Sequence, residues 1–149
     1  MRSTKNAFRS TLVLSSVSTQ EIGMPCSGPS STSVGIPRTV VVALCEDASD
    51  DNYEPTHQNL RELARMTDQD GQALEIVALP LPRALFCDGQ RLPGGYCNFL
   101  IANGVVIVPQ FGDPADEEAL RTLAPLFPGR DVRGSPSLNL VWGLGSFHC

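Results

Sequence analysis

The sequence predicts a mixed α/β fold built from a repeated unit of strand, acid-rich turn, helix and strand. Three observations predict it. Apolar runs at 39–45 and 105–108 are each followed by an acidic stretch, then by an amphipathic segment, and then by a further strand-like run. Repeated units bury their faces on one another, so the pattern indicates an array or a propeller-like ring. Because at least ~3 units are expected in a stable array, two copies predict an incomplete one.

The first repeat is expected to begin with a strand at 39–45 and to end with a strand at 74–79, since both runs are aliphatic and rich in β-branched residues. Between them, Pro55 suits the first turn of a helix, and Asp70-Gly71 is expected to end it. The apolar spacing predicts a buried stripe of Leu60, Leu63 and Ala64. Repeated prolines and glycines then predict a long loop over 80–96.

The second repeat is expected to begin with a hairpin. Asn103-Gly104 separates two apolar runs, and a type I′ turn there needs a positive φ at both residues. Asp113 is expected to cap a helix that Pro114 opens and Pro125 ends or kinks. The buried stripe expected for that helix is Leu120, Leu123 and Ala124. Short strands are expected at 131–133 and 138–141.

Composition excludes several classes of function. The net charge is −5 over 149 residues, which disfavours a nucleic-acid-binding surface. Apolar runs reach about six residues, far short of the ~20 needed to cross a bilayer, so no membrane span is expected. Five cysteines, an odd number without a Cys-x-x-Cys pair, disfavour a disulfide framework, and with two histidines they disfavour a metal site. No cofactor is expected.

Residues 1–33 differ from the body of the chain, which is expected to begin at residue 34. The segment holds nine Ser and four Thr, with Glu21 as its single acid. The favoured interpretation of this segment is a disordered or spurious tail. The alternative is an organelle transit peptide. Reduced cysteines favour a cytoplasmic location, and a transit peptide would make it organellar. The sequence leaves the oligomeric state open, and a homo-oligomer is compatible with it.

The candidate nucleophile is Cys149, which follows His148 and the glycines Gly143 and Gly145. A nucleophilic thiol needs a lowered pKa and an open approach, and glycines let a substrate come close to the backbone. By spacing alone, an incidental terminal cysteine is the favoured interpretation. His148 is awkward as a base for its neighbour, because adjacent residues of an extended strand point to opposite faces.

Other polar residues are given structural interpretations. His57 is interpreted as a solvated helix residue. The acidic loops 46–51 and 113–118 are interpreted as helix capping and solvation. The remaining candidates are cysteines interpreted as small packing residues, namely Cys45, Cys87 and Cys97.

Several segments occur in a fixed order and carry a family resemblance. They include Asp50-Asp-Asn-Tyr-Glu-Pro55, Tyr96-Cys-Asn-Phe-Leu-Ile-Ala-Asn-Gly104 and Gly143-x-Gly-x-x-His-Cys149. Over about residues 34–149 the chain resembles agmatine deiminases and bacterial-type peptidyl-arginine deiminases. The resemblance implies a partial pentein-type propeller, made of ββαβ units around a pseudo-fivefold axis. It also implies that Cys149 is the nucleophile and that no metal or organic cofactor is needed.

The resemblance implies a hydrolysis of guanidines. A cysteine thiolate attacks the guanidinium carbon, ammonia leaves, and water releases the ureido product from the amidino-cysteine adduct. For agmatine the product is N-carbamoylputrescine, an intermediate on the way to putrescine. Carboxylates must hold the guanidinium and a histidine must move protons.

Some family features are missing from the chain. The upstream Glu-Gly-Gly and His-x-Asp segments are absent, and Leu144 and Ser146 stand where the family has Gly and Asn. The leading expectation is therefore a truncated agmatine-deiminase-like chain. The alternatives are a catalytically inactive fragment, a half-domain that packs against a partner, a peptidyl-arginine deiminase, and a gene-model error.

Overall fold

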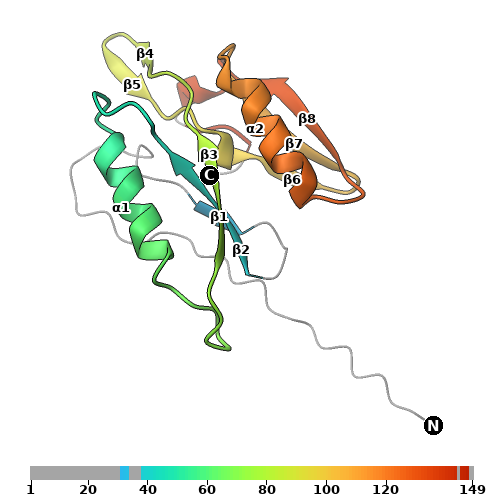
Figure 1. Cartoon of the computed structure of the whole chain (residues 1–149). Helices are drawn as coiled ribbons and strands as arrows, with labels where there is room; N and C mark the ends of the chain where they lie inside the picture. Colours follow the sequence, from blue (N-terminus) through green and yellow to red (C-terminus); the bar gives the residue numbers. More distant parts are fainter. Residues whose placement is uncertain (1–30, 34–37, 144, 148–149) are drawn as a thin grey trace.

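The computed structural model describes residues 31–33, 38–143 and 145–147. The expected tail over 1–33 lies almost wholly outside the described residues. The first unit consists of β1 (Ser31–Ser33), β2 (Thr39–Leu44), α1 (Tyr53–Leu63) and β3 (Glu75–Pro80). The second consists of β6 (Leu100–Ala102), β7 (Val105–Gln110), α2 (Ala115–Leu123) and β8 (Asp131–Pro136) (Figure 1).

The two units share one topology. Their sheets have the orders β1-β2-β3 and β6-β7-β8, with an antiparallel first pair and a parallel second pair in each. Each parallel pair is joined through a helix, as parallel strands require. The predicted repeat is confirmed, and the preceding antiparallel strand makes each copy a ββαβ unit.

The two helices bury side chains at the same spacing. α1 buries Thr56, Asn59 and Leu63, and α2 buries Asp116, Ala119 and Leu123. The predicted burial of Ala64 and Ala124 is wrong, because each helix ends one residue earlier and both alanines are exposed. The first helix also ends well before Asp70-Gly71.

The main core lies between the two units. Alternate side chains of β2 point to opposite faces. Val40 and Val42 pack with Leu63 of α1, whereas Val41 and Ala43 belong to the larger cluster. That larger cluster joins the first sheet to the second unit through Leu79, Val106, Val108, Ala119, Leu123 and Phe127. Because both faces of β2 are covered, the strand reads as a continuous apolar run.

The region 80–96 is more ordered than a long loop. It contains the antiparallel hairpin of β4 (Leu85–Cys87) and β5 (Gln90–Leu92), followed by the 3-10 helix η1 (Tyr96–Asn98). Asp88 and Gly89 connect the strands with φ values of 48° and 78°, the positive pair typical of a type I′ turn. The signal for this hairpin was the Asp-Gly dipeptide.

The predicted β6–β7 hairpin is confirmed, but its turn type is wrong. Ala102 pairs with Val105, which leaves Asn103 and Gly104 as the connection. Gly104 has a φ of 77°, whereas Arg38 and Asp88 are the only described non-glycine residues with positive φ. A type I′ turn needs both central residues in that region, so this turn is of another type.

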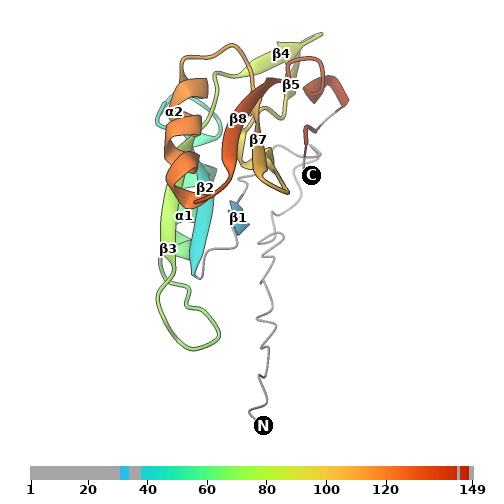
Figure 2. The ribbon, with the colours of Figure 1, turned by 90° about the vertical axis from the view of Figure 1, so that its right-hand side faces the viewer.

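The expected strand at 138–141 is also wrong. The chain there turns into the 3-10 helix η3 (Val141–Gly143), because the Ser137 carbonyl accepts hydrogen bonds from the amides of Leu140 and Val141 at 2.9 and 3.2 Å. Figure 2 shows α2 on one side of the second sheet and this C-terminal segment on the other.

The Asp116 carboxylate is buried between α2 and η1. It accepts hydrogen bonds from the Tyr96 hydroxyl at 2.7 Å and from the amides of Phe111, Gly112 and Asp113 at 3.0, 2.9 and 3.2 Å. Solvation therefore does not account for this acid. Thr56 of the first unit is the counterpart of Asp116, because each is the first buried residue of its helix. The Thr56 hydroxyl accepts a hydrogen bond from the Cys45 amide at 3.1 Å.

We expect Asp116→Ala to lower the free energy of unfolding by about 3 kcal/mol, because the substitution leaves buried donors without an acceptor. Tyr96→Phe removes one donor and is expected to cost about 1 kcal/mol. Urea titration followed by circular dichroism measures both. Glu117→Ala, one position along and exposed, is the matched control. An Asp116→Ala loss no larger than that of Glu117→Ala would contradict the assignment.

Candidate functional site

The predicted site residues fall at the C-terminal end of the described chain. Cys149 and His148 lie outside the described residues. Gly143 ends η3 and is exposed, and Gly145 is half-buried. A Cβ added to Gly143 would meet no described residue within 4 Å. The described residues that bear on the site are therefore those of the segment that leads to Cys149 and of the loops at the ends of β2 and β7.

The segment after β8 is anchored at its beginning by buried residues. The amide of Ser137 donates to the Gln110 carbonyl at 2.8 Å, which ties the segment to the end of β7. Val141 is fully buried in the main core. These two contacts set the direction in which the chain leaves the second sheet.

The same segment meets η1 further along. The Ser146 hydroxyl lies 3.5 Å from the Asn98 carbonyl oxygen, to which it donates. Asn98 ends η1, whose first residue, Tyr96, is held by Asp116. A continuous series of contacts thus runs from the buried carboxylate to a residue three positions before Cys149. Ser146 makes this contact where the resemblance expects Asn.

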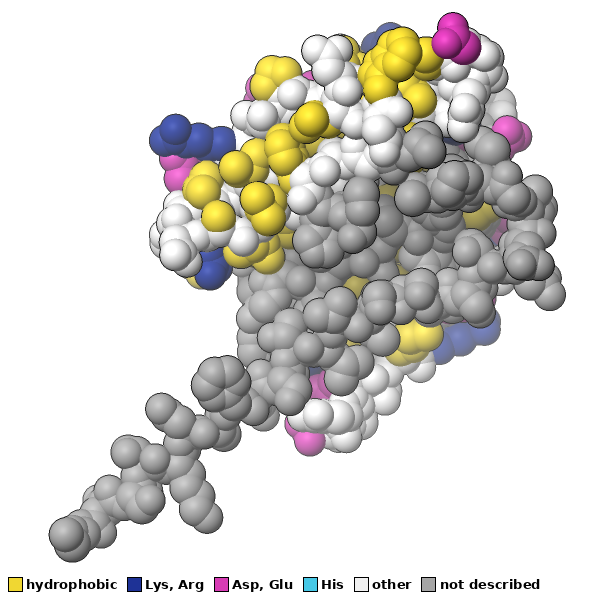
Figure 3. Space-filling view, turned by 180° about the vertical axis from the view of Figure 1, so that it is seen from behind, with side chains coloured by type: hydrophobic (Ala, Val, Ile, Leu, Met, Phe, Trp, Pro, Cys, Tyr) yellow, Lys and Arg dark blue, Asp and Glu magenta, His cyan; other side chains and the backbone are white. Residues whose placement is uncertain are grey.

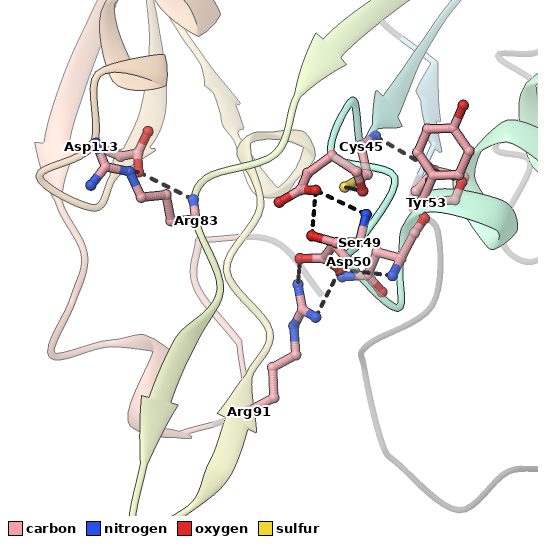
Figure 4. Close-up of polar contacts among 10 residues, drawn as sticks. Cys45, Ser49, Asp50, Tyr53, Arg83, Arg91 and Asp113 are labelled. Atoms are coloured by element: carbon pink, nitrogen blue, oxygen red, sulfur yellow. Dashed lines mark hydrogen bonds and ion pairs between the residues drawn. The ribbon is translucent and has the colours of Figure 1, made fainter.

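An ion pair holds the loop after β2. The Arg91 guanidinium donates to both oxygens of Asp50 at 2.8 Å each, and both side chains are mostly buried (Figure 4). This hydrogen bonding holds the pKa of Asp50 below its usual value. The pair ties the β4–β5 hairpin to the acidic turn of the first unit, so solvation does not explain Asp50.

Cys45 follows β2 directly and His57 lies in α1, and the two residues contact each other. His57 Nε2 lies 3.1 Å from the Cys45 carbonyl oxygen, so this nitrogen is the donor, and the imidazole stacks on Tyr53 with ring centres 4.2 Å apart. The interpretation of His57 as a solvated residue is therefore wrong. Burial raises the pKa of the Cys45 thiol, which keeps it protonated and poorly nucleophilic. Cys45 and Cys97 are buried, in accord with a packing role.

A second link joins the two units at this end. The amide of Arg83 donates to Asp113 Oδ2 at 3.1 Å, and its Nε lies 3.5 Å from the same oxygen (Figure 4). The predicted cap is one residue off, because α2 begins at Ala115 with Pro114 in the N-cap position. Asp113 precedes the cap, and its Oδ1 accepts from the Ala115 amide at 2.9 Å. The Asp50–Arg91 and Arg83–Asp113 contacts therefore link the loops after β2, β3 and β7 at one end of the molecule.

Within residues 31–33, 38–143 and 145–147, no three His, Cys, Asp or Glu side chains come together in a way that could hold a metal ion. Over the same residues, no helix has the length and apolar character required to span a membrane.

The sequence pattern of the Porphyromonas-type peptidyl-arginine deiminase family matches residues 32–149, which includes both units and the segment to Cys149. The chain belongs to this family. Its relatives include agmatine deiminases of Stutzerimonas stutzeri and Pseudomonas syringae pv. tomato, each 37% identical over 131 residues, covering 76% of this chain and 36% of the relative.

Solved structures of the deiminase family confirm the partial pentein-type fold. A Porphyromonas gingivalis protein described as a candidate arginine deiminase is 39% identical, with a TM-score of 0.76 over 80% of this chain and 35% of its own. The agmatine deiminase of Enterococcus faecalis is 29% identical, with a TM-score of 0.72 over 79% and 37%. This deiminase-family chain spans about one third of the length of the relatives it matches.

Some contacts of this site were not predicted from the deiminase sequence. The acidic turn was interpreted as capping and solvation, whereas its Asp50 pairs with Arg91, 41 residues away in the sequence. The contact of Ser146 with Asn98 joins positions 48 apart. No local pattern signals such pairs.

The Asp50–Arg91 pair is expected to make stability depend on pH. Because the folded pKa of Asp50 lies below an unfolded value of about 3.9, the stabilisation is complete above that pH and is lost as the pH falls through the folded pKa. Asp50→Asn should lower the free energy of unfolding by about 1–2 kcal/mol at pH 7. Urea titrations at several pH values should show this difference shrinking below about pH 4.

The matched control for that experiment is Asp51→Asn, which changes an exposed neighbouring acid. It should produce little change at any pH. A loss for Asp50→Asn that stays constant down to pH 2 would show that the ion pair is not its cause.

Proposed function

We propose that this chain carries the nucleophile-bearing part of a guanidine-hydrolysing deiminase whose substrate is agmatine. The observation that carries the proposal is the family match, which runs through the Gly-x-Gly-x-x-His-Cys segment to Cys149. The names of the curated relatives as agmatine deiminases support the choice of substrate. Peptidyl arginine is the second candidate, favoured by the name of the matched family.

In this proposal the Cys149 thiolate attacks the central carbon of the guanidinium. The carbon–nitrogen bond to one terminal nitrogen breaks, and that nitrogen leaves as ammonia after it gains a proton. Water then attacks the amidino carbon, which releases the ureido product and returns the thiol. For agmatine, the sum is agmatine plus water giving N-carbamoylputrescine plus ammonia. The chemistry is nucleophilic catalysis assisted by proton transfer.

Two acids with little exposure among the described residues are engaged elsewhere. Asp50 binds Arg91, and Asp116 binds Tyr96 and three backbone amides. His57 donates to the Cys45 carbonyl. We therefore assign the carboxylates that hold the guanidinium, and the histidine that moves protons, to Glu-Gly-Gly and His-x-Asp segments outside these 149 residues.

The test is ammonia release from agmatine. The 149-residue chain alone should release none. A chimaera that joins residues 38–149 to the preceding part of the Stutzerimonas agmatine deiminase should be active. Cys149→Ser should abolish the activity of the chimaera, by a factor of about 10³ or more. Cys45→Ser is the matched control and should retain it, because the Cys45 thiol is buried and protonated.

A folded chimaera that releases no ammonia from agmatine or from peptidyl arginine would refute the proposed function. Activity on peptidyl arginine alone would replace agmatine by the second candidate. A chimaera that keeps its activity as Cys149→Ser would refute the assignment of the nucleophile.

A further inference from the structure

The Asn98 carbonyl is held from both sides by buried aromatic residues. Before it, Tyr96 is fully buried and its hydroxyl donates to the Asp116 carboxylate at 2.7 Å. After it, Phe99 is 2% exposed, and its ring meets that of Phe127 edge to face with centres 5.7 Å apart. Such aromatic pairs stabilise a core beyond the area they bury. The core therefore fixes the position of this carbonyl at the last residue of η1.

The segment that leads to Cys149 is anchored by burial at Val141. Trp142, the next residue, is 61% exposed. Hydrophobic side chains lie at the surface in a band over the upper part of the molecule seen from behind (Figure 3). Gly143 and Gly145 follow, and glycine leaves the backbone a wide range of conformations. The described residues beyond Val141 are exposed or half-buried, so burial by itself does not determine the course of the segment.

The Ser146 hydroxyl joins this segment to the fixed carbonyl. It is half-buried and donates to the Asn98 carbonyl oxygen at 3.5 Å. Cys149 is three positions further along the chain, and three extended residues span at most about 11 Å. The hydrogen bond therefore limits where the thiol of Cys149 can lie, and it does so in a stretch whose glycines leave many conformations open.

The proposed chemistry is sensitive to such a limit. A thiolate that attacks a planar guanidinium carbon must approach it to about 3–3.5 Å with the correct alignment, and a misplacement of about 1 Å can cost a factor of ~10² in rate. A contact that restricts the nucleophile acts on the chemical step. It makes no contact with the substrate, so it should change kcat and leave KM nearly unchanged.

We propose that Ser146 and Tyr96 are positioning residues for the Cys149 thiol. Ser146 acts through the Asn98 carbonyl, and Tyr96 acts through the same carbonyl because its bond to Asp116 holds η1 in place. The inference rests on the proposed function, since it takes Cys149 as the nucleophile. It adds that a hydroxyl in the core of the chain and a hydroxyl near its end set the rate of the reaction together.

Hydrogen exchange of the 149-residue chain tests the hydrogen bond without catalysis. Mass spectrometry follows the peptic fragment that holds residues 142–149 and a second fragment that holds β7. Ser146→Ala should make the first fragment exchange at least threefold faster and leave the second unchanged, because the tie is local. Ser146→Thr keeps the hydroxyl and should exchange like the unchanged chain. Thr67→Ala, which removes an exposed hydroxyl between α1 and β3, is the matched control.

Kinetics of the chimaera with agmatine test the effect on the chemical step. Ser146→Ala should lower kcat about tenfold with KM changed less than about twofold, and Ser146→Thr should restore kcat. Tyr96→Phe should lower kcat about threefold. If Tyr96 acts through Ser146, the double variant should be no slower than Ser146→Ala alone, whereas independent structural losses would multiply. Thr67→Ala should keep both constants.

Several results would overturn the inference. They are unchanged exchange in Ser146→Ala, a kinetic loss confined to KM, a Ser146→Thr variant as slow as Ser146→Ala, and losses that multiply in the double variant. An unsubstituted chimaera without activity would refute the proposed function instead. Exchange would then still decide the hydrogen bond: faster exchange in Ser146→Ala supports it as the constraint on the segment, and unchanged exchange refutes it.

Discussion

The buried carboxylate of Asp116 is the interaction on which the rest of the structure depends. An ionised group is costly to bury unless hydrogen bonds compensate it, and here the Tyr96 hydroxyl and three backbone amides do so. Tyr96 is fully buried, and its burial near this acid raises the pKa of its hydroxyl, which remains a donor. The bond fixes η1 against α2. Because η1 also receives Ser146, the path toward Cys149 depends on a carboxylate far from it in sequence.

The packing of the two units follows from the burial of both faces of the first sheet. One face of β2 packs on α1 and the other on the second unit. On the second sheet, the side chains that face away from α2 are less buried: Leu100 is 36% exposed, and Val105 and Ile107 are half-buried. Two polar contacts link the loops at one end of the two units: Asp50 with Arg91, and Arg83 with Asp113. They hold the long connections in place without adding to the apolar core.

The groups that stabilise the fold are distinct from the groups proposed to carry out the chemistry. Asp50, Asp116, His57 and the Cys45 thiol all stabilise the fold, through an ion pair, hydrogen bonds and burial. A reactive thiol and a guanidinium-binding carboxylate need the opposite environment, open to substrate and free of permanent partners. The described contacts therefore belong to the scaffold, and the role of Cys149 as the nucleophile stays a proposal.

The sequence by itself determined the features that depend on neighbouring residues. The apolar runs marked β2, β3 and β7, Asn103-Gly104 marked a hairpin, and the repeat of these signals predicted two similar units. The ordered motifs up to Cys149 indicated the family, which the comparisons confirm. Tertiary structure alone decided the ends of the helices, the turn at 138–141, the burial of Asp116 and the pairing of Asp50 with Arg91. These features depend on which distant groups meet, because a carboxylate is solvated or buried according to the donors that folding brings to it.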